Sequence, residues 1–156
     1  MNEHEPTDVV AWANSLLETA RVGRLGLVDL DGAPRVLPVT FAVVGGRIWS
    51  AIDLKPKRSR EPARLRFLRR DPRAALTVDR YSDDWDELAW VQVLGTVSIV
   101  ETGDGAVGLE ALSAKYAPYR EAAPPGPLLC LEPQRYLWWQ AADPEGRGGH
   151  SDGRGG

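Results

Sequence analysis

The stretch RLGLVDLDGAPRVLPVTFAVVGGRIWSAI, which runs from Arg24 to Ile52, decides the fold class of this chain. It contains three β-prone runs, residues 24–30, 35–44 and 47–52. The runs are separated by Asp-Gly and Gly-Gly pairs, and two-residue links of these types are strong signals of β-hairpins. The stretch therefore predicts three consecutive antiparallel strands.

Pro38 stands in the middle of the second run. Proline has no backbone N–H to donate to a sheet, so it favours an edge strand or an irregular pairing. A position of this kind is also one where a ligand can reach free backbone groups.

Apolar periodicity, helix-capping residues and prolines predict the remaining elements. Apolar spacing predicts a first helix capped by Thr7, a short helix capped by Ser59 with Pro62 in its first turn, and a weaker third helix. The predicted helices span residues 7–20, 59–71 and 103–116, and the further strands span 74–78, 89–100 and 128–139. Residues 118–127 are predicted as a proline-rich link. The fold class is therefore mainly β (α+β), a six-stranded antiparallel barrel with flanking helices.

Composition fits a single globular domain over residues 1–142, followed by a glycine-rich tail, 143–156, that is predicted to be disordered. No apolar run approaches the roughly 20 residues of a membrane span, so no membrane partner is expected. The first residues carry acids instead of a basic and then apolar signal sequence. We therefore expect a cytoplasmic protein.

Cysteine and histidine usage excludes several kinds of site. The only cysteine, Cys130, lies among leucines, cannot form an internal disulfide and is predicted to be a buried core thiol. The histidines, His4 and His150, lie near the ends of the sequence, which removes most metal sites and histidine-based triads. The acidic loop 79–87 lacks the ligand spacing of a calcium loop and is interpreted as a solvated turn. No metal site is predicted.

Positive charge is concentrated between Lys55 and Arg73, where nine basic residues face two acids in a chain of net charge −3. The segment starts with a basic turn between the third strand and a helix, an arrangement that can bind phosphate. Arg66, Arg69 and Arg70 also fit the solvated face of that helix. Nucleic acid is disfavoured, because the nearby aromatic residues lie in an acidic loop and the pI is about 5.4.

Three motifs resemble a known family. They are Gly32 to Phe41, Asp53 to Arg58, and Asp71 to Tyr81. In this order and spacing they are similar to the split-barrel flavoproteins related to pyridoxamine 5′-phosphate oxidase, and within them to the actinobacterial branch that uses the deazaflavin coenzyme F420. The resemblance covers about residues 8–140. It implies a split β-barrel of the flavin mononucleotide (FMN) binding type.

The resemblance also implies a homodimer with the cofactor site at its interface. The ring would lie against the second and third strands, with Ser50 instead of Trp49 turned towards it. The phosphate would lie on the basic turn, with Arg64 within reach from the helix. Trp85 and Trp138 are candidate walls of the partner subunit's pocket, while Trp90 and Trp139 fit a barrel core or dimer contact. The implied ring contacts are Pro38, Val39, Thr40, Ser50 and Ala51, and the implied phosphate contacts are Lys55, Pro56, Lys57, Arg58 and Ser59.

The implied activity is an F420-dependent oxidoreductase that transfers a hydride to a conjugated small molecule such as an enone, a quinone or a tetrapyrrole. Two alternatives stay open: an FMN-dependent oxidase or reductase of the pyridoxamine 5′-phosphate oxidase type, and a non-catalytic binder of F420, FMN or haem. No catalytic residue is assigned. The proton would come from solvent, from a tyrosine such as Tyr81, or from a lysine near the ring.

Overall fold

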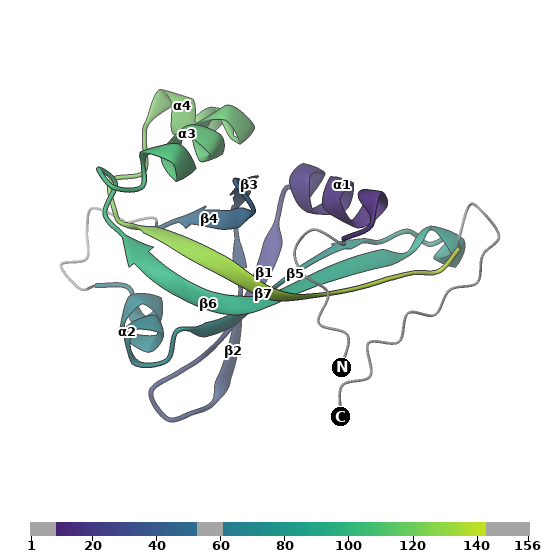
Figure 1. The fold of residues 1–156 in the computed structure, drawn as a ribbon, viewed down its shortest axis with the longest axis horizontal. Coiled ribbons are helices and arrows are strands. Elements are labelled where there is room, and N and C mark those ends of the chain that lie inside the picture. The colour runs from purple at the N-terminus through teal and green to yellow at the C-terminus, as the bar shows by residue number, and fades with distance from the viewer. Residues whose placement is uncertain (1–8, 53–60, 143–156) are drawn as a thin grey trace.

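The computed structural model describes residues 9–52 and 61–142, and within these ranges it shows one antiparallel sheet with flanking helices (Figure 1). The elements are, in chain order, α1 (Ala11–Thr19), β1 (Gly23–Val28), β2 (Pro34–Val39), β3 (Ala42–Val44), β4 (Arg47–Ala51), α2 (Ala63–Arg70), β5 (Arg73–Arg80), the 3-10 helix η2 (Trp85–Glu87), β6 (Ala89–Val100), α3 (Ala106–Lys115), α4 (Ala117–Glu121) and β7 (Leu128–Gln140). The predicted mainly-β class is confirmed.

The order of the strands makes this sheet a half-barrel. The order is β2-β1-β5-β6-β7-β4-β3, so β2 and β3, which follow each other in the chain, lie at opposite edges of the sheet. The short link of Thr40 and Phe41 joins these two edges, which curls the sheet into the split-barrel form. Pro38 lies on β2, an edge strand, which is one of the two arrangements that its missing N–H predicted.

The described part of the chain has seven strands where the sequence predicted six. The predicted strand 35–44 is divided, since β2 pairs with β1 while β3 pairs with β4. The reason lies at Phe41, whose backbone N–H donates to the hydroxyl of Tyr116 at 3.1 Å and whose carbonyl accepts from it at 3.0 Å. Because a side chain takes both backbone groups of Phe41, the ladder is interrupted there.

Several predicted boundaries also differ. Helix α2 begins at Ala63 with Pro62 at its N-cap, later than predicted, and it buries Leu65 and Leu68 as expected. Helix α1 has Val10 at its N-cap, whereas the predicted cap Thr7 lies outside the described residues. Helix α4 occupies the start of the predicted proline-rich link and was missed. The predicted strand 89–100 coincides with β6, and 128–139 coincides with β7 to within one residue.

Two apolar clusters fill the two sides of the curled sheet. The main cluster lies inside the barrel, where α1 adds Ala13 and Leu17. The second lies between β4 and α3, where the Trp49 ring packs so closely on Gly108 that a Cβ there would lie 2.2 Å from Trp49 Cδ2. A cavity of about 10 Å³ remains inside the barrel, which is at most about the space of one water molecule. The barrel interior therefore has no room for a cofactor ring.

Candidate functional site

The candidate site lies at the seam of the barrel, which we define as the end of β2, the link at residues 40–41 and the end of β4. The Ser50 hydroxyl donates to the Thr40 carbonyl at 2.7 Å, which holds the two sides of the seam together. Val39 and Ser50 line the same small cavity. Pro38 precedes Val39 and Ala51 follows Ser50 in the chain. The structure therefore brings the predicted ring contacts into one region.

These five residues present very different surfaces. Pro38 is exposed and Thr40 is half-buried, whereas Val39, Ser50 and Ala51 are buried. Along β4 the side chains alternate, so Ser50 points into the barrel while Ala51 lies beneath α3. A ring on the outside of the barrel can thus touch the side chains of Pro38 and Thr40, and it can reach Ser50 and Ala51 only through their backbone.

Two tyrosines of the α3–α4 region complete the seam, and the sequence analysis missed both. The Tyr119 hydroxyl lies 2.7 Å from the Thr40 hydroxyl. The Tyr116 hydroxyl accepts from the Phe41 N–H, and its single hydrogen is shared between the carbonyls of Phe41 and Arg21, which lie 3.0 and 2.9 Å away. Burial raises the pKa of Tyr116, so its hydroxyl stays protonated as a donor. In the sequence, their spacing of three residues was the one signal that could have indicated this pair. Tyr119 fell within the predicted proline-rich link, so the pair was missed.

Lys115 is a third residue that the sequence pattern did not indicate, although it is the only lysine outside the predicted basic turn. Its Nζ atom is buried, lies 4.0 Å from the centre of the Phe41 ring, and has no hydrogen-bond acceptor among the described residues. Burial, followed by the nearby positive charge of Arg21, lowers the pKa of Lys115 to about 8. This amine is therefore close to titrating at neutral pH.

The predicted phosphate contacts Lys55, Pro56, Lys57, Arg58 and Ser59 lie outside the described residues. In the sequence they follow β4 and the buried Ile52, which is the last described residue before them. Arg64, which lies in the first turn of α2, is half-buried and engaged in an interaction. Arg69 forms an ion pair with Glu61, and Arg70 donates to the Leu30 carbonyl at 2.8 Å. These last two contacts favour a structural role for the outer arginines of α2.

The structure places Trp85 and Trp138 away from the seam of their own chain. Trp85 lies in η2, which precedes β6 at the end of the β5–β6–β7 ribbon remote from β4 (the ribbon is seen in Figure 1). Its exposed fraction is 71%. Trp138 is half-buried and packs against the main core. Tyr81, the tyrosine suggested as a proton source, is also at this end of the ribbon and donates to Asp83 at 3.2 Å. Within their own chain, these three residues therefore do not contribute to the seam.

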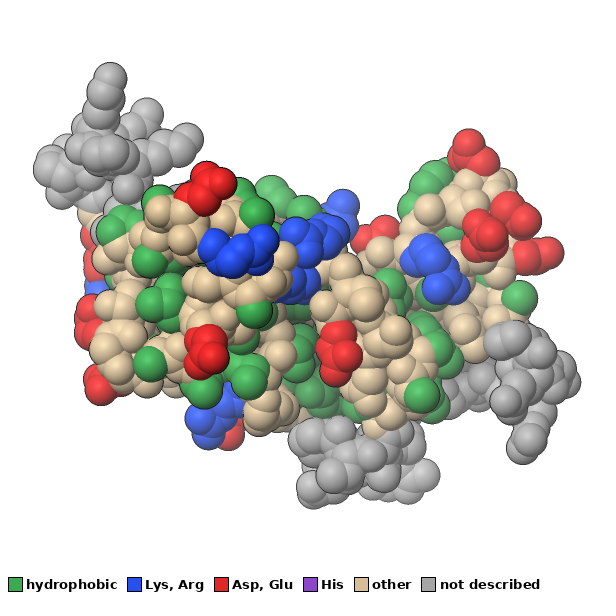
Figure 2. Space-filling model, turned by 90° about the horizontal axis from the view of Figure 1, so that it is seen from above, with side chains coloured by type: hydrophobic (Ala, Val, Ile, Leu, Met, Phe, Trp, Pro, Cys, Tyr) green, Lys and Arg blue, Asp and Glu red, His purple; other side chains and the backbone are tan. Residues whose placement is uncertain are grey.

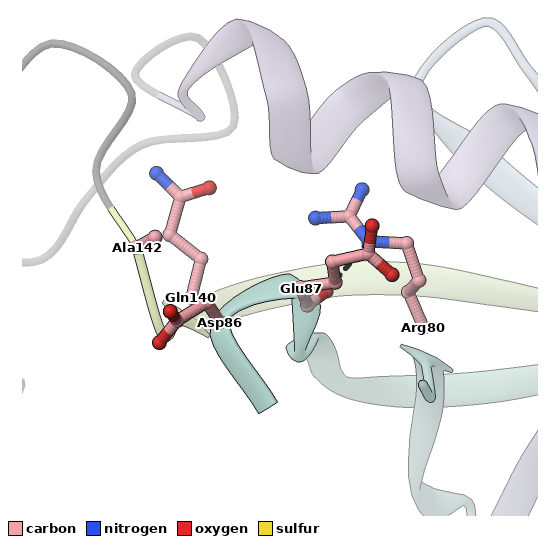
Figure 3. A pocket seen from close by; sticks show the side chains of 5 residues that line it. All are labelled: Arg80, Asp86, Glu87, Gln140 and Ala142. Carbon is pink, nitrogen blue, oxygen red and sulfur yellow. Dashed lines mark hydrogen bonds between the residues drawn. The ribbon is translucent and has the colours of Figure 1, made fainter. Parts of the chain in front are cut away.

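An open pocket of about 410 Å³ lies at the same end of the ribbon, lined by Arg80, Asp86, Glu87, Gln140 and Ala142 (Figure 3). Figure 3 shows the Arg80 and Glu87 side chains next to each other, beside a helix that passes above them. Arg80 Nε donates to the Glu87 carbonyl at 2.8 Å, which closes the turn between β5 and β6. The residues that line the pocket combine opposite charges and include no hydroxyl, thiol, imidazole or amine side chain, so we assign it no chemistry.

Two kinds of site are absent from the described residues. No group of three His, Cys, Asp or Glu side chains in this part of the chain is arranged to hold a metal ion. Among the described helices, none is both long and apolar enough to span a bilayer.

Comparison with known proteins finds one family and several solved structures that are similar to this chain. Residues 12–140 match the family described as pyridoxamine 5′-phosphate oxidase. A solved structure described as an F420 reductase has a TM-score of 0.61 and 25% sequence identity, and the match covers 83% of this chain and 98% of that chain. No curated protein matches the chain.

Two mycobacterial structures share the fold. A conserved hypothetical protein from Mycobacterium tuberculosis has a TM-score of 0.68 and 22% identity, and the match covers 85% of this chain and 86% of that one. A heme binding protein from Mycobacterium smegmatis has a TM-score of 0.68 and 20% identity over 89% of this chain and 55% of that one.

Proposed function

The chain belongs to the pyridoxamine 5′-phosphate oxidase family, and from this premise we propose that it is an F420-dependent oxidoreductase of the cytoplasm. Its substrate would be a conjugated small molecule that accepts a hydride. The observation that carries this proposal is the match to an F420 reductase over nearly the whole of that protein. The concentration of positive charge between Lys55 and Arg73 supports it, because F420 bears a phosphate and a tail of glutamate carboxylates.

The residues at the seam fit a flat ring bound outside the barrel. The exposed Pro38 offers an apolar surface on an edge strand, and the half-buried Thr40 offers a hydroxyl. The predicted phosphate contacts begin four residues after the end of β4, with Arg64 on the helix beyond them. When bound, the reduced deazaflavin supplies a hydride, and a proton completes the reduction of the acceptor.

The chain's own residues hold the seam rigid. Ser50 fixes the Thr40 carbonyl, and Tyr116 fixes both backbone groups of Phe41. The hydroxyls of Thr40 and Tyr119 form a pair in which either atom can donate. One hydroxyl hydrogen of this pair is therefore available to the ring or the acceptor, in a position set by the other member. Such preorganised donors hold a hydride acceptor in a fixed geometry at little entropic cost.

We further propose that the site is completed in a homodimer. Trp90 on β6 and Trp139 on β7 are directly paired, and their exposed fractions are 37% and 38%. Together with the exposed Trp85 they give the ribbon an apolar surface that a second copy can cover. A partner's ribbon laid along the seam would bring its Trp85 to the cofactor, as the sequence-based expectation for Trp85 requires. Trp138 packs against its own core and would not lie on this surface.

The alternative with a specific observation in its favour is an FMN-dependent oxidase, since the family carries the name of such an enzyme. It would use the same seam and the same basic turn. A haem-binding role has less support, because the described residues include no histidine and burial raises the pKa of the one thiol, Cys130. A raised pKa disfavours the thiolate that would ligate iron.

The test is a side-by-side titration of the purified protein with F420 and with FMN, followed by quenching of tryptophan fluorescence. Tight binding of F420 alone, with turnover of an enone or quinone by its reduced form, is the expected result. Preference for FMN would favour the oxidase. Binding of neither would contradict both cofactor assignments.

A further inference from the structure

Three cationic side chains, Arg21, Lys115 and Arg120, gather at the C-terminal end of α3. We call them the α3 cation cluster. Arg21 Nη1 donates to the Lys115 carbonyl at 2.9 Å. Arg120 Nη1 donates to the carbonyls of Ser113 and Ala114 at 2.9 and 3.0 Å. The view onto the side of the molecule that carries α1, α3 and α4 shows Lys and Arg side chains grouped together (Figure 2). None of the three forms an ion pair among the described residues.

Capping of α3 explains only part of this arrangement. Cations near a helix C-terminus are favourable, and each arginine uses one of its terminal nitrogens on helix carbonyls. A guanidinium has five N–H donors, so each exposed arginine keeps several donors for another acceptor. Lys115 adds a third positive charge that caps nothing, because its Nζ atom lies between the Phe41 and Tyr116 rings at 4.0 and 5.5 Å from their centres.

The cluster is electrostatically unbalanced without a ligand. Burial is the larger cause that disfavours the charged form of Lys115, and the nearby positive charge of Arg21 disfavours it further. An anion bound by the two arginines would offset this repulsion. The planar fork of a guanidinium is suited to a carboxylate, which it can bind through two parallel hydrogen bonds.

The cluster also adjoins the seam. Tyr116, next to Lys115 in the chain, binds the backbone of Phe41, and Tyr119, next to Arg120, contacts the Thr40 hydroxyl. An acceptor that lies against a ring at Thr40 could therefore extend a substituent to the arginines. The cofactor's own anionic groups are assigned to a different element, the basic segment after β4.

We propose that the α3 cation cluster binds a carboxylate of the hydride acceptor, so the substrate class is a conjugated carboxylic acid. This inference rests on the proposed function for the place of the acceptor. The shared chemistry would also fit a glutamate carboxylate of the cofactor tail, and the experiment separates these two sources.

The test uses an enone acid, 4-oxo-4-phenylbut-2-enoate, and its uncharged methyl ester. Binding of each to the full-length protein is measured calorimetrically without cofactor, and kcat/KM is measured with reduced F420. We expect the acid to bind about tenfold or more tightly than the ester, as charge-assisted hydrogen bonds imply. The double variant Arg21→Gln, Arg120→Gln should lose this preference and keep its affinity for F420.

Arg47→Gln is the matched control, because Arg47 is an exposed arginine that lies near Glu132 elsewhere on the sheet. It should keep the preference for the acid. If the double variant is poorly folded by circular dichroism, Arg120→Gln alone should give an intermediate preference.

Each outcome bears on the proposal in one direction. Equal binding of acid and ester by the unaltered protein overturns it. Loss of F420 affinity in the double variant, with the preference for the acid retained, assigns the cluster to the cofactor tail and also overturns it. Because the calorimetric preference needs no cofactor, it can be present when F420 fails to bind, which separates a failure of the proposed function from a failure of this inference.

Discussion

Replacing Lys115 by methionine tests whether this buried amine destabilises the folded protein. The pKa of Lys115 is lowered from 10.5 to about 8, chiefly by burial. At about 1.36 kcal/mol for each pKa unit this difference corresponds to about 3 kcal/mol, and we expect about 2 kcal/mol because the side chain is half-buried. Methionine has a similar length and carries no charge. It therefore removes the free-energy cost of the buried charge while it fills the space beside the Phe41 and Tyr116 rings.

The size of this stabilisation depends on pH. Below about pH 8 the lysine is protonated in both states, so the folded protein carries the full penalty of a buried charge. Between about pH 8 and 10.5 only the unfolded chain binds the proton, so the unaltered protein gains stability relative to the variant as the pH rises. Above 10.5 the penalty is absent. Lys115→Met should therefore have its largest relative stability near pH 7 and lose about 2 kcal/mol of this advantage by pH 10.5.

The assay is urea unfolding of both proteins at several pH values from 7 to 10.5, with the free energy of unfolding compared at each. Arg120→Met serves as the control, since it removes a positive charge at the same helix end and leaves Lys115 in place. Its difference from the unaltered protein should not vary with pH. A Lys115→Met difference that is constant to within about 0.5 kcal/mol over the whole range would refute the reasoning.

Three further predictions concern the seam, the packing of α3 and the predicted basic turn. Tyr116→Phe removes the hydroxyl that binds two backbone groups at the strand break, and should lower the free energy of unfolding by about 2 kcal/mol in urea titrations. Gly108→Ala should destabilise the protein by about 2 kcal/mol or more and alter the near-ultraviolet tryptophan signal, because the added methyl group would overlap a buried indole. Lys57→Ala with Arg58→Ala should weaken F420 binding by several kcal/mol, about two charge-assisted bonds, whereas Arg66→Ala should change it little; an unchanged affinity in the double variant would exclude the turn from the site.

Local pattern was sufficient for much of the fold. Strand β6 and nearly all of β7 were found from their β-prone runs and flanking breakers, and Leu65 and Leu68 were found as the buried side of α2. The edge position of Pro38 followed from its missing N–H. In each case the deciding interactions involve neighbours in the chain or the chemistry of a single residue.

The division of the second predicted strand could not be found in this way. Residues 35–44 are β-prone throughout, and the break at Phe41 depends on Tyr116, which is 75 positions away in sequence. The same long-range closure buries Lys115 over the Phe41 ring and sets the Tyr119 hydroxyl against Thr40. A pattern of neighbouring residues carries no information about such partners.

The sequence was thus enough to establish the antiparallel barrel class, the concentration of positive charge and the resemblance that points to a deazaflavin, because these depend on residue types and their spacing. The tertiary structure decided which of the predicted contacts to a cofactor ring have an accessible side chain. It left Pro38 and Thr40 accessible at the seam and buried Ser50 and Ala51. It also placed Trp85 at the remote end of the ribbon (Figure 1). These outcomes follow from how the sheet closes and how α3 and α4 pack on it, which are properties of contacts between residues distant in sequence.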